Sequence, residues 1–172
     1  SLIDGGAGED TVWLRFGENL DFEEMRQGED GVLFRNIETL DLTREGFDHA
    51  LSNLSLQDVF DMTDEHNVLT IKADEGDRVS FLESDGWKLN ADKSAANTAF
   101  DVYEATGADG KTAEVLITKG FKGIEGDVQE AGGAGKQSAP ASAEPSFFVD
   151  PEAQSQFARD LALRFGINKE RR

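Results

Sequence analysis

The sequence predicts a mainly β protein: a compact β-sandwich or β-roll-like domain with one short helix, followed by a flexible linker and a C-terminal helix. Short runs rich in β-branched and aromatic residues recur over roughly the first 120 residues, and Gly-Asp or Asp-Gly turns separate several of them. One segment has the apolar spacing of an amphipathic helix. After residue 130, Gly, Ala, Ser and Pro become frequent, which is typical of a linker.

The predicted strands occupy six segments: 12–16, 31–42, 67–73, 78–82, 100–105 and 113–118. We expect the last two to form a β-hairpin that closes on Asp109-Gly110, because Asp-Gly favours a tight turn. A helix is predicted over 54–64, with Ser55 as its N-cap. Residues 22–27 are compatible with a further helical turn.

Charge divides the chain into an acidic domain (1–130), a linker (131–145) and a tail (146–172). The acidic domain carries 30 acids and 11 bases, and the rest carries 5 acids and 6 bases. A net charge of −18 disfavours nucleic acid and anionic lipid as partners. No signal peptide and no long apolar run are visible, so membrane insertion is not expected. The absence of cysteine excludes disulfides and thiolate metal sites.

The stretch GGAGEDTVW, residues 5–13, predicts a calcium site. Its three glycines can take positive φ and turn their carbonyls inward, and Asp10 adds a carboxylate. Such an oxygen-only environment suits a hard cation such as calcium. The expected ligands are Asp10 and the backbone around Gly6 and Gly8, with Asp4 as a neighbour. A glycine-rich loop without an ion is the alternative.

The same stretch matches the nonapeptide G-G-x-G-x-D-x-U-x of repeats-in-toxin (RTX) proteins, where U is a large apolar residue. Only one such nonapeptide is present, whereas in that family the next turn completes the calcium site. Residues 1–118 also resemble a module of very large bacterial surface adhesins. The matching positions are Asp58, Val59, Asp61, Met62, Asn67, Leu69, Ile71, Gly76, Asp77, Val79, Gly86, Trp87, Tyr103, Val115 and Ile117.

The resemblance implies a calcium-dependent structural or adhesive module of an extracellular protein, secreted or held at the bacterial cell surface. It implies export by a type I secretion system. The expected partners are that machinery, other protein chains, cell-surface components, or further copies of this chain. Two alternatives stay open: the C-terminal export and folding module of a secreted RTX protease or lipase, and a subunit of a surface layer or filament.

Two further groups of carboxylates are candidate calcium ligands. Asp58, Asp61 and Asp64 recur at three-residue intervals around the predicted helix, and Asp74 and Asp77 lie in a turn. A solvated acidic helix end is the alternative for the first group. Neither group matches the twelve-residue calcium loop of an EF-hand.

No catalytic signature is present, so we do not expect an enzyme. His49 and His66, the two histidines, lack the spacing of a zinc site, and no G-x-S-x-G elbow occurs. His66 is expected to be a turn residue beside acids. The aromatic residues Trp13, Trp87 and Tyr103 are expected to pack in the core or in turns.

The tail predicts an amphipathic helix over 151–165, with Asp150 as N-cap and Gly166 at its end. Its apolar stripe needs a partner surface. An export signal, a helix folded back on the core, and a dock to another chain are the three interpretations. The stripe consists of Ala153, Phe157, Leu161 and Phe165.

Overall fold

The computed structural model describes residues 1–28, 33–126 and 128–131. They belong to the first of two units of the chain, residues 1–133. The predicted tail with Phe157, Leu161 and Phe165, and the predicted linker beyond residue 131, lie outside the described residues. Within the described part, the prediction of a mainly β protein is confirmed.

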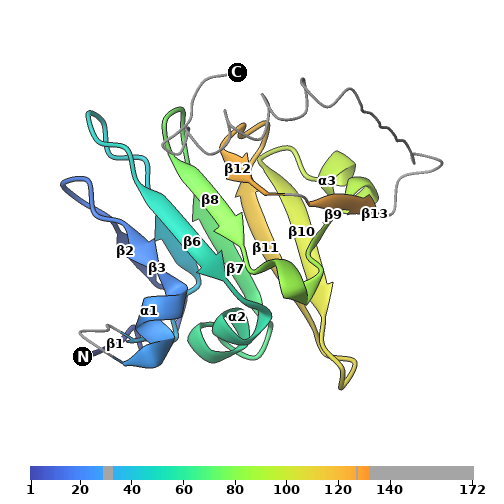
Figure 1. The fold of residues 1–172 in the computed structure, drawn as a ribbon, viewed down its shortest axis with the longest axis horizontal. Helices are drawn as coiled ribbons and strands as arrows, with labels where there is room; N and C mark the ends of the chain where they lie inside the picture. Colours follow the sequence, from blue (N-terminus) through green and yellow to red (C-terminus); the bar gives the residue numbers. More distant parts are fainter. Residues whose placement is uncertain (29–32, 127, 132–172) are drawn as a thin grey trace, which may run out of the picture. The chain divides into compact units, whose positions relative to one another are not determined.

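Two stacks of parallel strands form the body of the domain, and the chain alternates between them (Figure 1). One stack belongs to a seven-stranded sheet with the order β13-β9-β10-β11-β7-β5-β2. The other is a four-stranded sheet with the order β12-β8-β6-β3. In the first stack the strands are β2 (Thr11–Trp13), β5 (Thr39–Asp41), β7 (Val68–Lys72) and β11 (Thr112–Thr118). In the second they are β3 (Leu20–Asp21), β6 (Ala50–Leu54), β8 (Arg78–Phe81) and β12 (Ile124–Glu125).

Each passage from the first stack to the second makes one coil, and successive coils pair in parallel. Thr11 pairs with Thr39, and Thr39 with Thr70, so the coil period is 28 and then 31 residues. The last coil begins at β11, which pairs with β7 through Leu116 and Thr70. A two-stranded parallel sheet, β1 (Leu2–Asp4) with β4 (Leu33–Arg35), joins the first two coils as well.

Apolar side chains stack in register along both sheets and fill the core between them. Leu40 and Ile71, at the centre of one ladder, are fully buried. Such ladders remove several apolar side chains from water in each coil, which is the main force that holds the coils together. The ladders are Val12–Leu40–Ile71–Ile117 and Leu20–Leu51–Val79–Ile124.

Three short helices lie in the connections between strands of the described part. The predicted helix is α2 (Leu56–Met62), and Ser55 caps it in a capping box, as expected. The predicted helical turn is α1 (Phe22–Gln27), capped by Asp21. A third helix, α3 (Ala91–Ala96), and a 3-10 turn, η1 (Glu83–Asp85), were not predicted.

The predicted hairpin is present as β10 (Phe100–Thr106) and β11, with Thr106 opposite Thr112. It carries the seven-stranded sheet beyond the coils, because β9 (Lys88–Asn90) pairs with β10, and β13 (Gln129–Ala131) with β9. The segment 31–42 gives two strands, β4 and β5, where one was expected. Asn36 lies between them with φ 57°, a left-handed conformation that asparagine tolerates.

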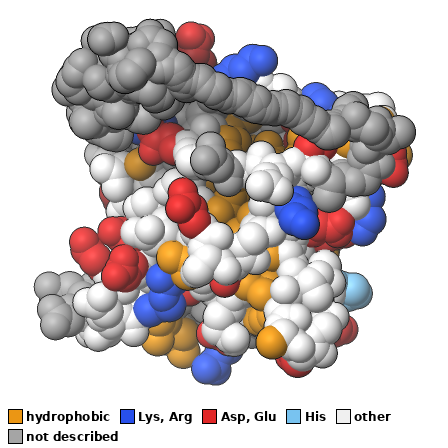
Figure 2. All heavy atoms as spheres, turned by 45° about the vertical axis from the view of Figure 1, so that its right-hand side comes forward, with side chains coloured by type: hydrophobic (Ala, Val, Ile, Leu, Met, Phe, Trp, Pro, Cys, Tyr) orange, Lys and Arg blue, Asp and Glu red, His pale blue; other side chains and the backbone are white. Residues whose placement is uncertain are grey.

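On the face drawn in Figure 2, Asp and Glu side chains are spread over the surface, with Lys and Arg between them and apolar side chains near the centre. The acidic charge of the chain is therefore not gathered in one place on this face.

Candidate metal centre

The N-terminal turn brings the first coil against the second. Gly6 and Gly8 have φ of 90° and 116°, as the glycine pattern predicts. Gly5 is needed for a different reason: a Cβ on it would lie 2.3 Å from the carbonyl oxygen of Asn36 and 2.6 Å from Cβ of Asp10. Only glycine allows the backbone to pass this close.

Asp10 and Glu38 form a pair of carboxylates where the two coils meet. The N–H of Asp10 donates to Oε2 of Glu38 over 2.9 Å. The carbonyl oxygen of Asp10 accepts hydrogen bonds from the N–H groups of Glu38 and Thr39, both at 3.0 Å. The register of β2 and β5 places the two acids at equivalent positions of neighbouring coils.

Each acid of this pair has a buried carboxylate oxygen without a hydrogen-bond partner in the described part of the chain: Oδ2 of Asp10 and Oε1 of Glu38. Glu38 is only 6% exposed. A buried, unpartnered carboxylate oxygen costs free energy unless a cation or a proton neutralises it. Oxygen atoms are the ligands that calcium prefers, so the pair fits a hard divalent cation.

Asp4, the predicted neighbour, has a different set of contacts. Its Oδ1 accepts hydrogen bonds from the N–H of Gly6 (3.0 Å) and from Nδ2 of Asn36 (2.8 Å). The hydrogen bond from Asn36, followed by that from Gly6, holds the pKa of Asp4 below its ordinary value. Asp4 therefore tethers the turn to the second coil, at the exposed surface.

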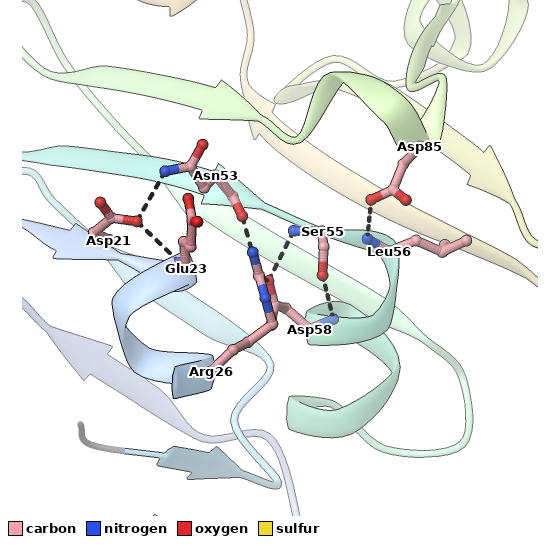
Figure 3. Close-up of polar contacts among 8 residues, drawn as sticks. All are labelled: Asp21, Glu23, Arg26, Asn53, Ser55, Leu56, Asp58 and Asp85. Atoms are coloured by element: carbon pink, nitrogen blue, oxygen red, sulfur yellow. Dashed lines mark hydrogen bonds and ion pairs between the residues drawn. The ribbon is translucent and has the colours of Figure 1, made fainter. Parts of the chain in front are cut away.

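Asp58, at the start of α2, contacts α1 rather than its acidic neighbours (Figure 3). Its Oδ2 accepts from Nη1 of Arg26 at 2.5 Å and from the N–H of Ser55 at 2.8 Å. Burial raises the pKa of Asp58, against the lowering effect of the hydrogen bonds from Ser55 and the charge of Arg26. These contacts give Asp58 a structural role.

The other two acids of this group also have local partners. Asp61 accepts a hydrogen bond from Nε2 of Gln57, one helical turn before it. Asp64 accepts from the backbone N–H of His66 at 2.9 Å and contacts its Nδ1 at 3.1 Å. The backbone hydrogen bond from His66 is the first cause that lowers the pKa of Asp64, and the hydrogen bond to Asp64 raises the pKa of His66. His66 is thus a turn residue beside an acid, as predicted.

Asp77, a candidate calcium ligand in a turn, is buried. Its two carboxylate oxygens accept hydrogen bonds from backbone N–H groups. Oδ1 accepts from His49 and Oδ2 from Asp74, each at 2.9 Å. Burial, followed by the hydrogen bond and charge of Asp77, raises the pKa of Asp74. His49 is buried beside Asp77, with Nδ1 3.0 Å from the carbonyl oxygen of Leu42.

The aromatic residues divide into two groups. Trp87 and Tyr103 pack in the core as expected, around Phe81, whose ring is 4.8 Å from that of Trp87 and 5.6 Å from that of Tyr103. For Trp13 the expectation of core or turn packing is wrong, because it lies on β2 and is 69% exposed. Alternation along this short strand turns Val12 inward and Trp13 outward.

Of the predicted ligands, only Asp10 meets a second carboxylate with an unpartnered oxygen, and that carboxylate, Glu38, was not predicted. The described residues contain no group of three or more His, Cys, Asp or Glu placed to hold a metal. The sequence signal for Glu38 is the likeness of EDTVWL (9–14) to IETLDL (37–42), which aligns Asp10 with Glu38 at the coil period.

Comparison with known proteins identifies no relative: the chain matches no family model, no curated protein and no solved structure. Among the described residues, no helix has the length and apolar character needed to span a bilayer.

Proposed function

We propose that this chain is a calcium-stabilised structural and adhesive module of an extracellular bacterial surface protein exported by type I secretion. The observation that supports it is the Asp10–Glu38 pair, with two buried carboxylate oxygens left without partners at the junction of two coils. A divalent cation there neutralises both charges and links coil to coil. Calcium is abundant outside cells, so a module of this kind gains its full stability after export.

Charge supports the same proposal. The chain has 35 acids against 17 bases, so a cation is drawn toward its surface by the field of the whole molecule. The acids with local partners, such as Asp58 and Asp64, take their hydrogen bonds from groups within the protein. Asp10 and Glu38 have capacity left for an outside ligand.

A calcium titration of the full chain tests the proposal. With two carboxylates, and no third acid beside them among the described residues, we expect a Kd on the order of 10⁻⁴–10⁻³ M, as in extracellular modules. At 10 mM calcium this gives about 1.4–2.7 kcal/mol of added stability. Calorimetry measures the affinity, and urea unfolding with calcium or with EDTA measures the gain in the free energy of unfolding.

The variants Asp10→Asn and Glu38→Gln separate a cation site from an ordinary polar contact. Each removes one charge with almost no change in shape, so each should raise stability in EDTA and abolish the gain from calcium. Asp61→Asn removes a charge from an exposed acid that binds Gln57 and is the matched control; its calcium response should equal that of the wild type. Identical titrations of wild type and Asp10→Asn would refute the assignment.

A further inference from the structure

The first coil ends both stacks of strands on the same side of the molecule. β1, β2 and β3 each close the edge of a sheet, and among the described residues each pairs on one side only. At its other end, the parallel stack β2-β5-β7-β11 is covered, because β10, β9 and β13 continue the seven-stranded sheet beyond β11 (Figure 1). Terminal repeats of coiled β proteins normally carry a polar outer face, and open strand edges normally carry charge.

The outer surface of the first coil is apolar instead. Of the six large apolar side chains that the described residues expose, four belong to this coil, with Phe16 61% exposed. The other two belong to the second coil and lie beside the first: Leu33 pairs with Leu2, and the ring of Phe47 meets that of Phe16. We call this surface, together with the open edges of β1, β2 and β3, the first-coil face. The apolar side chains form two groups, one on the β1–β4 pair and one around the Phe16–Phe47 ring contact after β2, and exposed apolar groups of this kind mark interaction sites. The six side chains are Leu2, Ile3, Trp13, Phe16, Leu33 and Phe47.

Two arginines on this face lack acidic partners although acids outnumber bases two to one in the chain. Within the described part, neither Arg15 nor Arg44 forms an ion pair, and both guanidinium groups lie over the ring of Phe16, at 5.1 and 5.2 Å. Phe16 meets Phe47 edge to face at 5.9 Å. Tryptophan and arginine are the residues that most often dominate the binding energy of protein interfaces.

The same face also carries acids. An open groove of about 630 Å³ beside the aromatic pair is lined by Trp13, Arg15 and Arg44 and also by Asp41 and Glu45. Asp41, the last residue of β5, accepts hydrogen bonds from the N–H and the hydroxyl of Thr43, two residues further on. A partner of uniform negative charge would be repelled by these carboxylates, whereas a surface that holds both signs complements a copy of itself. Isologous interfaces have this property, because residue i of one copy meets residue j of the other and the reverse.

We propose that the first-coil face is the interface of a twofold homodimer of this chain. The twofold axis sets each edge strand antiparallel to its copy, so the open N–H and C=O groups pair across the interface. Burial of Trp13 and its apolar neighbours drives association, and Arg15 and Arg44 find carboxylates on the second copy. The proposal goes beyond the calcium site and does not depend on it.

Sedimentation equilibrium of the full chain at 150 mM salt, from about 1 to 300 µM, tests the proposal. The wild type should form a dimer, and Trp13→Glu should weaken dimerisation at least about 30-fold, the effect of losing one dominant interface residue. Trp13 is exposed, so this variant should fold, and circular dichroism confirms that. Gln129→Glu, on β13 at the other end of the sheet, changes the charge equally and should dimerise like the wild type.

Hydrogen exchange locates the contact. On dimerisation, amides of β1, β2 and β3 should become protected, while those of β10 should not change. A wild type that stays monomeric at 300 µM, or a Trp13→Glu variant that associates as the wild type does, overturns the proposal. So does association that disappears in Phe157→Asp/Leu161→Asp but survives in Trp13→Glu, because the tail would then be the interface.

Discussion

The glycines of the first turn meet different steric demands although the sequence presents them as one pattern. Gly6 and Gly8 have positive φ and open space where a Cβ would project. Gly5 carries the first coil against Asn36 and Asp10 of the site, where a Cβ cannot fit. The close approach of Gly5 to Asp10 therefore helps to position the Asp10–Glu38 pair, whereas Gly6 and Gly8 allow the loop backbone its positive φ angles.

Substituting these glycines separates the two demands. Gly5→Ala should lower the free energy of unfolding by about 2–3 kcal/mol, because the added methyl displaces backbone. Gly8→Ala should cost about 1 kcal/mol, the strain of a left-handed alanine. Urea unfolding in EDTA measures both. Equal costs, or a larger cost for Gly8→Ala, would show that the contact of Gly5 with Asn36 and Asp10 is not tight.

Neighbouring coils are also joined through polar contacts at the helical side of the domain (Figure 3). Arg26 of α1 donates to the carboxylate of Asp58 and to the carbonyl oxygen of Asn53, and Asn53 donates to Asp21, the N-cap of α1. Asp85 of η1 accepts from the N–H of Leu56, the first residue of α2. Both α1 and α2 are thus tethered by residues of the coil that follows.

The Arg26–Asp58 pair gives a pH-dependent prediction. Burial raises the pKa of Asp58 in the folded state, so the folded protein binds this proton more tightly than the unfolded chain. The stability that this proton gives is present below the ordinary pKa of 3.8 and is lost as the pH rises through the raised value. Arg26→Ala removes a positive charge that lowers this pKa. In the variant, Asp58 therefore keeps its proton, and the stability that the proton gives, up to a higher pH.

Arg26→Ala should therefore cost about 1–2 kcal/mol at pH 7 and clearly less at pH 3, where Asp58 is protonated in both states. In an Asp58→Asn background the same substitution should cost little at either pH. Thermal unfolding of the wild type, the two single variants and the double variant at pH 3 and pH 7 measures these changes in stability. A cost that does not change between pH 3 and pH 7 would mean that Arg26 acts through packing or through its bond to Asn53.

At the scale of the whole molecule, local patterns predicted local structure and left the topology undetermined. The hairpin on Asp109-Gly110 and the capped helix after Ser55 depend on neighbours within a few residues, and both are present. The parallel pairing joins residues 27 to 46 apart with an uneven period, because β9, α3 and β10 are inserted before the last coil. A nine-residue motif carries no signal of a period of this length.

The candidate site could be predicted only in part for the same reason, because half of it depends on pairing between residues far apart in the sequence. Asp10 was predicted from the glycine turn, but its partner comes from the next coil, and only strand register places Glu38 beside it. For Trp13 the sequence predicts core or turn packing rather than a ligand-binding role, and the structure places it at the surface. It is exposed because alternation along β2 turns Val12 to the core and Trp13 outward, and β2 has no further strand beside it in the described part.

A stack of coils makes stability depend on position along the stack, because each coil contacts only its neighbours. Ile71 is fully buried between Leu40 and Ile117, so Ile71→Ala should lower the free energy of unfolding by about 2–5 kcal/mol. Val12 occupies the same ladder in the terminal coil, is half-buried, and has a ladder partner on one side only in the described part, Leu40. Val12→Ala should cost about 1 kcal/mol or less.

Hydrogen exchange of the monomer at low concentration gives the matching kinetic prediction. Amides of β2 should exchange through local opening, well before those of β7, because opening the first coil breaks one coil–coil junction and opening the third breaks two. Ile71→Ala should speed exchange across β5, β7 and β11, whereas Val12→Ala should speed it in β2 only. Uniform protection of all four strands, with both substitutions acting everywhere, would mean that the stack unfolds as one cooperative unit.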